Sequence, residues 1–307
     1  MIDNIRMFVI NKHSFENHIE DNNLMDLTSK LNMLTGELME YPKKGKDLNL
    51  EVTITPLSAT IIGSIHKYKN LLEDNGNQNY DDFNFCQIQE VVGGLIKKFN
   101  IERDTKLTNL EFGFNIAVSK DPQIIIDNNV LMNNFKAPNR NEKFSGKGDY
   151  KEFKLTDYRI KIYNKSKQFN IEAKVLRVEL KIVKKRLLNS LGIHCLEDLQ
   201  YKEVLKNLFK LFVEHFEGIN IVDYFEQEKV PEKDRNKLNR YMSPIYWIRI
   251  KSEKSQKQIS RLKADFNNLL NKYKLLEMKN EIREKLNAKF IELLDSDCFN
   301  STYENVA

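Results

Sequence analysis

The sequence has few cysteines and no long apolar run, and these gaps exclude several classes of protein. Its three cysteines stand far apart, with no Cys-x-x-Cys pair, which argues against a disulfide framework and against a zinc ribbon. No stretch of about 18 uninterrupted apolar residues could span a bilayer. The N-terminus lacks a basic region, an apolar stretch and a small-residue cleavage site. We therefore expect a cytoplasmic protein with no membrane partner.

A phosphate-binding loop is also missing. No Gly-x-x-x-x-Gly-Lys-Ser/Thr run occurs, so we expect no ATP site, and any helicase activity would come from a partner. What the chain does have is an uneven distribution of charge. From Pro231 to Phe290 it carries 16 Lys and Arg against 7 Asp and Glu, a local charge of +9 in a protein of net charge +5. The remainder is therefore about −4, and the basic excess is C-terminal.

Local patterns predict an α+β fold, with a mostly antiparallel sheet, flanking helices and a helical C-terminal region. Alternation of apolar and polar residues predicts strands at 50–55, 59–66, 108–118, 157–165 and 174–183. Helical spacing predicts helices at 85–99, 202–217 and 257–294, and a short helix around 27–38 that precedes the sheet. The turn-rich stretch 120–155 predicts a loop with a short strand at 123–127. The change of period near Arg186 suggests two parts, 1–190 and 191–307.

Alternation also divides each predicted strand into an apolar and a polar face, because residues i and i+2 point the same way. The segment 158–165 places on its polar face Arg159, Lys161, Tyr163 and Lys165. The segment 176–182 places there Arg177, Glu179 and Lys181. The short connection between these segments predicts a hairpin-like return, so Tyr163 and Glu179 are expected to share one surface.

Two further segments add polar groups to the expected surface. The segment 109–116 presents Glu111 beside Gly113, whose lack of a side chain would admit a metal ion or a DNA backbone close to the sheet. The polar face of 59–66 ends at His66. A tyrosine phenol has a pKa of about 10, so nearby cations would help it to ionise, and a Mg²⁺ or Mn²⁺ ion held by carboxylates and one imidazole would polarise a phosphate. This set favours phosphodiester transfer, although strand tyrosines and alternating charges are more often packing residues and a solvated face.

The same residues carry a resemblance to a known family. The stretch Tyr158-Arg-Ile-Lys-Ile-Tyr163-Asn-Lys165, followed by Leu176-Arg-Val-Glu179-Leu-Lys181, resembles the core motif of rolling-circle replication initiators. The likeness is to the Rep_trans plasmid initiators and to the related nicking initiators of filamentous and single-stranded DNA phages, and it covers about residues 50–190. It implies an HUH or Rep-like nuclease core in 1–190, with Tyr163 as the nucleophile and Glu179 as an active-site acid.

Upstream, Thr108-Asn-Leu-Glu111-Phe-Gly-Phe-Asn115 is similar to the family strand that carries metal-binding acids. Glu111 matches the first acid, but Asn115 stands in place of the second, which leaves the number of carboxylate ligands open. His66 stands where an earlier metal-site strand is expected and is the third ligand candidate. The resemblance implies metal-dependent nicking and rejoining of one strand at an origin, through a 5′-phosphotyrosyl link, with Lys165 and Lys161 assisting at the phosphate or the phenol.

The expected partners follow from this interpretation. They are double- and single-stranded origin DNA, a host helicase and polymerase, and a second copy of the chain if the protein is a homodimer. The residues expected to contact DNA are Arg159, Lys161, Arg177, Arg249, Lys251, Lys254 and Arg261. Three other functions stay open: a conjugative relaxase with the same chemistry, a regulator that binds DNA without cutting it, as Asn115 would suit, and an α+β protein whose basic helices bind RNA.

Overall fold

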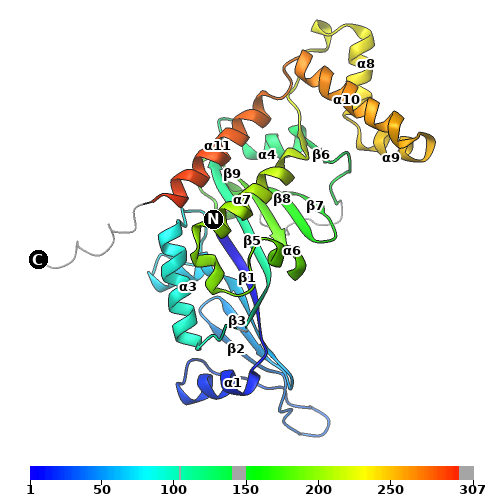
Figure 1. Ribbon diagram of the computed structural model, residues 1–307. Helices are drawn as coiled ribbons and strands as arrows, with labels where there is room; N and C mark the ends of the chain where they lie inside the picture. Colours follow the sequence, from blue (N-terminus) through cyan, green and yellow to red (C-terminus); the bar gives the residue numbers. More distant parts are fainter. Residues whose placement is uncertain (104, 140–149, 297–307) are drawn as a thin grey trace, which may run out of the picture.

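The computed structural model describes residues 1–103, 105–139 and 150–296, and over these residues the fold is α+β (Figure 1). An antiparallel eight-stranded sheet has the order β2-β3-β4-β1-β5-β9-β8-β7, and β10 pairs with β6 in a second small sheet. The strands are β1 (Ile2–Val9), β2 (Lys43–Asp47), β3 (Leu50–Ile54), β4 (Ala59–Ser64), β5 (Lys106–Ala117), β6 (Val130–Asn133), β7 (Tyr150–Lys154), β8 (Tyr158–Asn164), β9 (Val175–Ile182) and β10 (Ile219–Ile221). The α+β prediction is confirmed.

The helices flank the sheet and then form the C-terminal region. They are α1 (Lys12–Asp21), α2 (Ile65–Leu72), α3 (Phe85–Phe99), α4 (Pro122–Ile124), α5 (Lys165–Phe169), α6 (Lys185–Ser190), α7 (Lys202–Glu217), α8 (Glu232–Tyr241), α9 (Pro244–Glu253), α10 (Gln256–Lys272) and α11 (Glu277–Leu294). Helix α3 begins at a capping box in which Asn84 and Gln87 exchange hydrogen bonds, as its sequence favours. In the described part of the chain, no helix has the length and apolar content needed to cross a membrane.

The two faces of β5 explain how the sheet separates its core from its polar surface. Phe112 and Phe114 pack edge-on against Phe212 of α7, at ring centroid distances of 5.9 and 5.3 Å. Phe290 of α11 lies 6.2 Å from Phe114. These rings belong to the main apolar core between the sheet and the helices. Strict alternation along β5 therefore turns Glu111 and Gly113 to the opposite face of the sheet.

Strand β1 lies at the centre of the sheet, between β4 and β5, although its sequence did not predict a strand. Its register with β5 shifts between Ile2 and Ile5, so that Asp3 and Asn4 together stand opposite the single residue Glu111. Such a β-bulge breaks the alternation of apolar and polar residues by one position. The prediction that the sheet begins after the first helix is therefore wrong, and the bulge is the reason that the pattern gave no signal.

Three other local predictions are corrected. Residues 27–38 form a hairpin-like arm instead of a helix, with bridges from Thr28 to Lys44 and from Leu31 to Leu38 and a turn at Gly36. Only Leu27, at its base, packs against the core, whereas Leu31, Leu34 and Leu38 are 54%, 98% and 71% exposed. Residues 123–127 are helical, and the strand comes later, at β6. The long helix expected over 257–294 is two helices, α10 and α11, separated at 273–276.

A second apolar cluster holds the C-terminal helices together. Tyr241, Trp247 and Phe266 pack there, one from each of α8, α9 and α10, and we call residues 231–274 the three-helix module. Figure 1 shows this module projecting away from the sheet, whereas α7 and α11 lie against it. The division at residue 190 stays a prediction, but the packing assigns α7 and α11 to the same core as the sheet.

Candidate active site

Three carboxylates meet on the polar face of the sheet. Asp3 of β1, Glu111 of β5 and Glu179 of β9 are buried, and each offers an oxygen within 4.8 Å of the others. The register brings them together, because Gly113 pairs with Glu179 and the bulge sets Asp3 opposite Glu111. Carboxylate oxygens are the ligands that Mg²⁺ and Mn²⁺ prefer. The donor set therefore fits a hard divalent cation, with Asp3 as an acid that the sequence analysis missed.

Two cationic side chains already neutralise part of this acidic group. Arg177 donates from Nε to Glu179 Oε2 over 2.8 Å and from Nη2 to Asp3 Oδ2 over 3.2 Å. Lys181 donates from Nζ to Glu111 Oε1 over 2.6 Å. Three carboxylates against two cations leave one negative charge, which a divalent ion would more than offset.

The pKa values of the acids reflect this crowding. Burial, followed by the negative charges of Glu179 and Asp3, raises the pKa of Glu111 above its usual range. For Asp3 burial acts in the same upward direction, but the Arg177 guanidinium and then Lys165 outweigh it and hold the pKa low. Negative charge is therefore in excess around Glu111, and a cation bound there would stabilise its ionised form.

Tyr163 lies beside the carboxylates, as the sequence predicted. It stands opposite Arg177 in the pairing of β8 with β9, and its hydroxyl donates to Glu179 Oε2 over 3.3 Å. Its ring is only 8% exposed. Contrary to the expectation that nearby cations favour the phenolate, burial and then Glu179 raise the pKa of Tyr163 well above 10. In the described arrangement the phenol is therefore protonated at neutral pH.

Lys165 is buried at the start of α5 and does not face solvent as a surface phosphate ligand would. Its Nζ donates to Asn79 Oδ1 over 2.6 Å, and Asn79 Nδ2 donates to Asp3 Oδ2 over 2.6 Å. Its Nζ also lies 5.5 Å from the centre of the Tyr163 ring. Burial and then Arg177 lower the pKa of Lys165 to about 7. A chain of polar contacts therefore joins this lysine to the carboxylate group through Asn79.

The structure places His66 outside the group of three carboxylates. Strand β4 ends at Ser64, so His66 lies in the first turn of α2, where its ring stacks on Phe83 at 4.8 Å. Its Nε2 is 2.9 Å from Asp81 Oδ1, and burial lowers its pKa. Instead it is Ser64 that reaches the site, donating its hydroxyl to Asp3. Within the described residues, the group that could hold a metal consists of Asp3, Glu111 and Glu179 and does not include His66. Metal binding by His66 stays a prediction.

Two positions on β5 have different roles from those expected. A Cβ at Gly113 would lie 2.4 Å from Val178 O, so the glycine is required by the close approach of β9. Asn115, at the position of the second family acid, accepts from Arg177 Nη1 over 3.2 Å and donates from Nδ2 to the carbonyl oxygens of Asn79 and Tyr80. The Asn115 amide thus fixes the loop that carries Asn79. The third carboxylate of the group comes from Asp3 instead of from position 115.

The residues expected to contact DNA fall into three groups. Arg177 is 3% exposed and fully engaged with Asp3, Glu179 and Asn115, so its expected DNA contact would require these bonds to break. Arg159 and Lys161 of β8 are partly exposed, and Lys161 Nζ lies 5.2 Å from the Tyr150 ring. Four other expected contacts, Arg249, Lys251, Lys254 and Arg261, are exposed on the three-helix module. DNA contact by these residues stays a prediction.

Comparisons with known proteins give a likeness to a solved structure. No protein-family model matches the chain, and no curated protein matches it. Among solved structures, the chain is similar to a rolling circle replication initiator protein from Geobacillus stearothermophilus, with 12% sequence identity and a TM-score of 0.39. The match covers 76% of this chain and 88% of that chain. At this similarity the function has to be argued from the geometry of the site.

Proposed function

We propose that this protein is a metal-dependent tyrosine nuclease that nicks and rejoins one DNA strand, as an initiator of rolling-circle replication does. The observation that carries the proposal is the contact between Tyr163 and Glu179, one of three buried carboxylates whose oxygens lie within 4.8 Å of one another. A nucleophile beside an all-oxygen cation site is the arrangement that phosphoryl transfer needs. The family resemblance of the motifs around Tyr163 and Glu179 supports the same chemistry.

The proposed cofactor is Mg²⁺ or Mn²⁺, held by Asp3, Glu111 and Glu179. When bound, the ion supplies positive charge that polarises the scissile phosphate and offsets the carboxylates. Arg177 holds Asp3 and Glu179 in position through its paired bonds, and Asn4 does the same for Glu111 by donating from its side-chain amide. These residues keep the carboxylates convergent against their mutual repulsion.

In the proposed reaction, the Tyr163 oxygen forms a bond to phosphorus as the bond from phosphorus to the 3′ oxygen breaks. The phenol proton leaves along the existing hydrogen bond to Glu179 Oε2, the departing 3′ oxygen takes up a proton from water, and Glu179 returns its proton to the hydroxide that remains. The products are a 5′-phosphotyrosyl link and a free 3′-hydroxyl that primes synthesis. Attack of a 3′-hydroxyl on the link reverses the reaction and rejoins the strand.

The test is the formation of a covalent protein–DNA adduct. The wild type and Tyr163→Phe are incubated with Mn²⁺ and the supercoiled or single-stranded DNA of the protein's own replicon, then separated under denaturing conditions. Tyr158→Phe is the matched control, because Tyr158 lies on the same strand but stacks on His215 at 3.8 Å, away from the carboxylates. We expect an adduct with the wild type and the control and none with Tyr163→Phe.

Other outcomes separate the competing functions. If no variant forms an adduct while all bind the DNA equally with and without metal, the protein is a DNA-binding regulator and the nuclease proposal is wrong. If the adduct maps to a conjugative transfer origin instead of a replication origin, the chemistry stands and the protein is a relaxase. An adduct that persists in Tyr163→Phe would reject Tyr163 as the nucleophile.

A further inference from the structure

Helix α9 presents an unusual surface to solvent. Its inner side carries Tyr246, Trp247 and Ile250, which are buried in the three-helix module. Its outer side carries Ile245, Ile248, Arg249 and Ser252, at the i, i+3, i+4 and i+7 positions that share one helix face. Ile245 is 64% exposed and Ile248 is 59% exposed. Two large apolar side chains and an arginine thus stand together in water on one helix.

The surroundings of this face are strongly basic. Residues 244–264 contain six Lys and Arg but only one acid, Glu253. The exposed cations next to the outer face of α9 and along α10 are Arg249, Lys251, Lys254, Lys257 and Arg261. The pKa of Lys263 is lowered, first by burial and then by the positive charge of Lys251, which shows that cations lie close together here. The partner of this face should therefore be densely negative.

The module holds α9 firmly. Trp247 Nε1 donates to the carbonyl oxygen of Tyr241 over 2.6 Å, and the Trp247 ring lies 4.4 Å from that of Phe135, next to β6. Tyr241 also donates its hydroxyl to Asp265 of α10 over 2.9 Å. These contacts join the three helices to one another and to the body, so the outer face of α9 is presented as a rigid unit.

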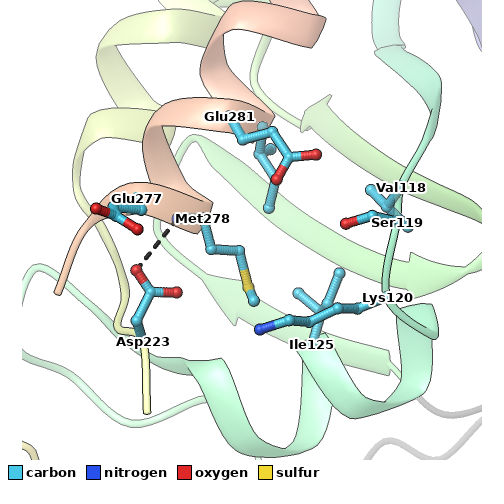
Figure 2. A pocket seen from close by; sticks show the side chains of 9 residues that line it. Val118, Ser119, Lys120, Ile125, Asp223, Glu277, Met278 and Glu281 are labelled. Atoms are coloured by element: carbon cyan, nitrogen blue, oxygen red, sulfur yellow. Dashed lines mark hydrogen bonds between the residues drawn. The ribbon is translucent and has the colours of Figure 1, made fainter. Parts of the chain in front are cut away.

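The connection to the body is also ordered. The chain enters and leaves the module through two segments that lie side by side, where the Asp223 amide donates to Leu275 O over 2.9 Å. Figure 2 shows the next contact, in which the Met278 amide at the start of α11 donates to Asp223 Oδ2 over 3.2 Å. A pocket of about 180 Å³ lies beside this junction, between α11 and the end of β5. The module is thus anchored at a fixed place on the catalytic body.

From this placement we propose that α9 is a recognition helix for double-stranded DNA, with Ile245, Ile248 and Arg249 entering the major groove. An α-helix fits that groove, apolar side chains contact the thymine methyl group, and arginine pairs with guanine. The neighbouring Lys251, Lys254, Lys257 and Arg261 are exposed and are proposed to contact the flanking phosphates. The inference builds on the proposed function, since it identifies the part of the protein that would select the DNA to be nicked.

A second copy of the chain is a poorer fit to the same face. Two isoleucines form a small apolar area, and a symmetric contact would bring the same five cations of each copy together. Duplex DNA complements this face, because its negative charge surrounds a groove that contains apolar methyl groups.

The experiment measures base selection and salt dependence separately, using the full-length protein. A library of duplexes with a random 20-base-pair core is selected with the wild type, and the enriched duplex and a scrambled duplex are then titrated by fluorescence anisotropy. Ile245→Ser combined with Ile248→Ser should reduce the preference for the enriched duplex by about tenfold or more and leave the salt dependence unchanged. Circular dichroism checks that this variant is folded.

Replacing two phosphate-contacting cations should have the opposite signature. Lys254→Gln with Lys257→Gln should weaken binding to both duplexes equally and reduce the slope of log affinity against log salt by about 2. The matched control is Lys206→Gln with Lys210→Gln, which removes two charges from α7 on the body and should change neither duplex's binding.

Three results would overturn the inference. They are a wild type that enriches no sequence, an isoleucine variant that selects the same bases with the same preference, and an isoleucine variant that turns a dimer into a monomer in sedimentation. Adduct formation on single-stranded DNA tests the proposed function independently. If the α9 variants lose base selection while no protein forms an adduct, the recognition helix stands and the nuclease fails. If adducts form with unaltered base selection, the reverse holds.

Discussion

The carboxylate site and the three-helix module use charged residues in opposite ways. At the site, Asp3, Arg177 and Glu179 are each less than 5% exposed, and each is satisfied by the others. In the module, Arg249 and Glu253 are 3.7 Å apart with side chains that are 65% and 53% exposed. Buried ions lose their hydration and depend on their partners, whereas exposed ions keep water and are screened by salt. Charge is therefore part of the architecture at the site and is available for a ligand in the module.

This difference predicts which property a substitution in each region will change. A change at the site should alter folding stability and metal binding together, since the same contacts serve both. A change on the outer surface of the module should alter binding to a charged partner and leave folding nearly untouched. The following predictions compare the two regions.

The largest contrast is expected between two arginine substitutions. Arg177→Met leaves Asp3 and Glu179 buried without their cation, so it should lower the free energy of unfolding by about 3–5 kcal/mol. Arg249→Met should change it by no more than about 0.5 kcal/mol. Urea denaturation in EDTA measures both, and adding Mn²⁺ should restore part of the loss in Arg177→Met alone. Equal effects of the two substitutions would remove the distinction between the regions.

The next contrast concerns metal affinity. Asp3→Asn removes a carboxylate from the convergent group, and we expect the affinity for Mn²⁺ to fall by at least about 10- to 100-fold, the loss typical of a partner one step further from the metal. Asp82→Asn is the matched control, because Asp82 pairs with Lys289 over 2.7 Å and lies outside the group. Calorimetry on the folded proteins gives both affinities. Unchanged binding by Asp3→Asn would leave the metal with a different set of ligands.

The smallest expected effect is a pH dependence of stability. The pKa of Lys165 is lowered from 10.5 to about 7 in the folded protein, so between these values the unfolded chain binds more protons and stability rises with pH. The full cost of burying the charged lysine is present below pH 7. Lys165→Met should therefore be more stable than the wild type at pH 6. This advantage should decline between pH 7 and pH 10.5, by at most about 1.4 kcal/mol per pH unit.

Chemical denaturation from pH 6 to pH 10 measures this difference. Lys257→Met, at an exposed position of the module, should show no such trend and serves as the control. A stability difference for Lys165→Met that stays constant over this range would mean that Lys165 does not change its protonation in the folded protein.

Much of the fold was predictable because its signals are local. The alternation in 108–118, 157–165 and 174–183 predicted three strands and their polar faces, and the register of β5, β8 and β9 places Glu111, Tyr163 and Glu179 on one surface. The helix at 85–99 was predicted from its spacing and is present with the same bounds. In each case the face of an element is set by residues two, three or four positions apart.

The predictions failed where a pattern was broken or had no partner surface. The bulge in β1 hid a central strand and with it Asp3, because two consecutive polar residues interrupt the alternation. The arm at 27–38 has helical spacing of leucines, but beyond Leu27 these leucines are exposed and pack against no core. The pair Asp3-Asn4, flanked by Ile2 and Ile5, is the signal that would have suggested a bulge.

The sequence by itself determined the class of the fold, the basic C-terminal region, and the alternation that places Tyr163 and Glu179 on polar faces. Only the tertiary structure decided that Asp3 completes the carboxylate group, that Arg177 and Lys165 are buried supports, and that α9 turns two isoleucines to solvent. The physical reason is distance along the chain. Periodicity reports which way a side chain points, but burial and charge pairing depend on contacts such as that of Asp3 with Arg177, 174 residues away.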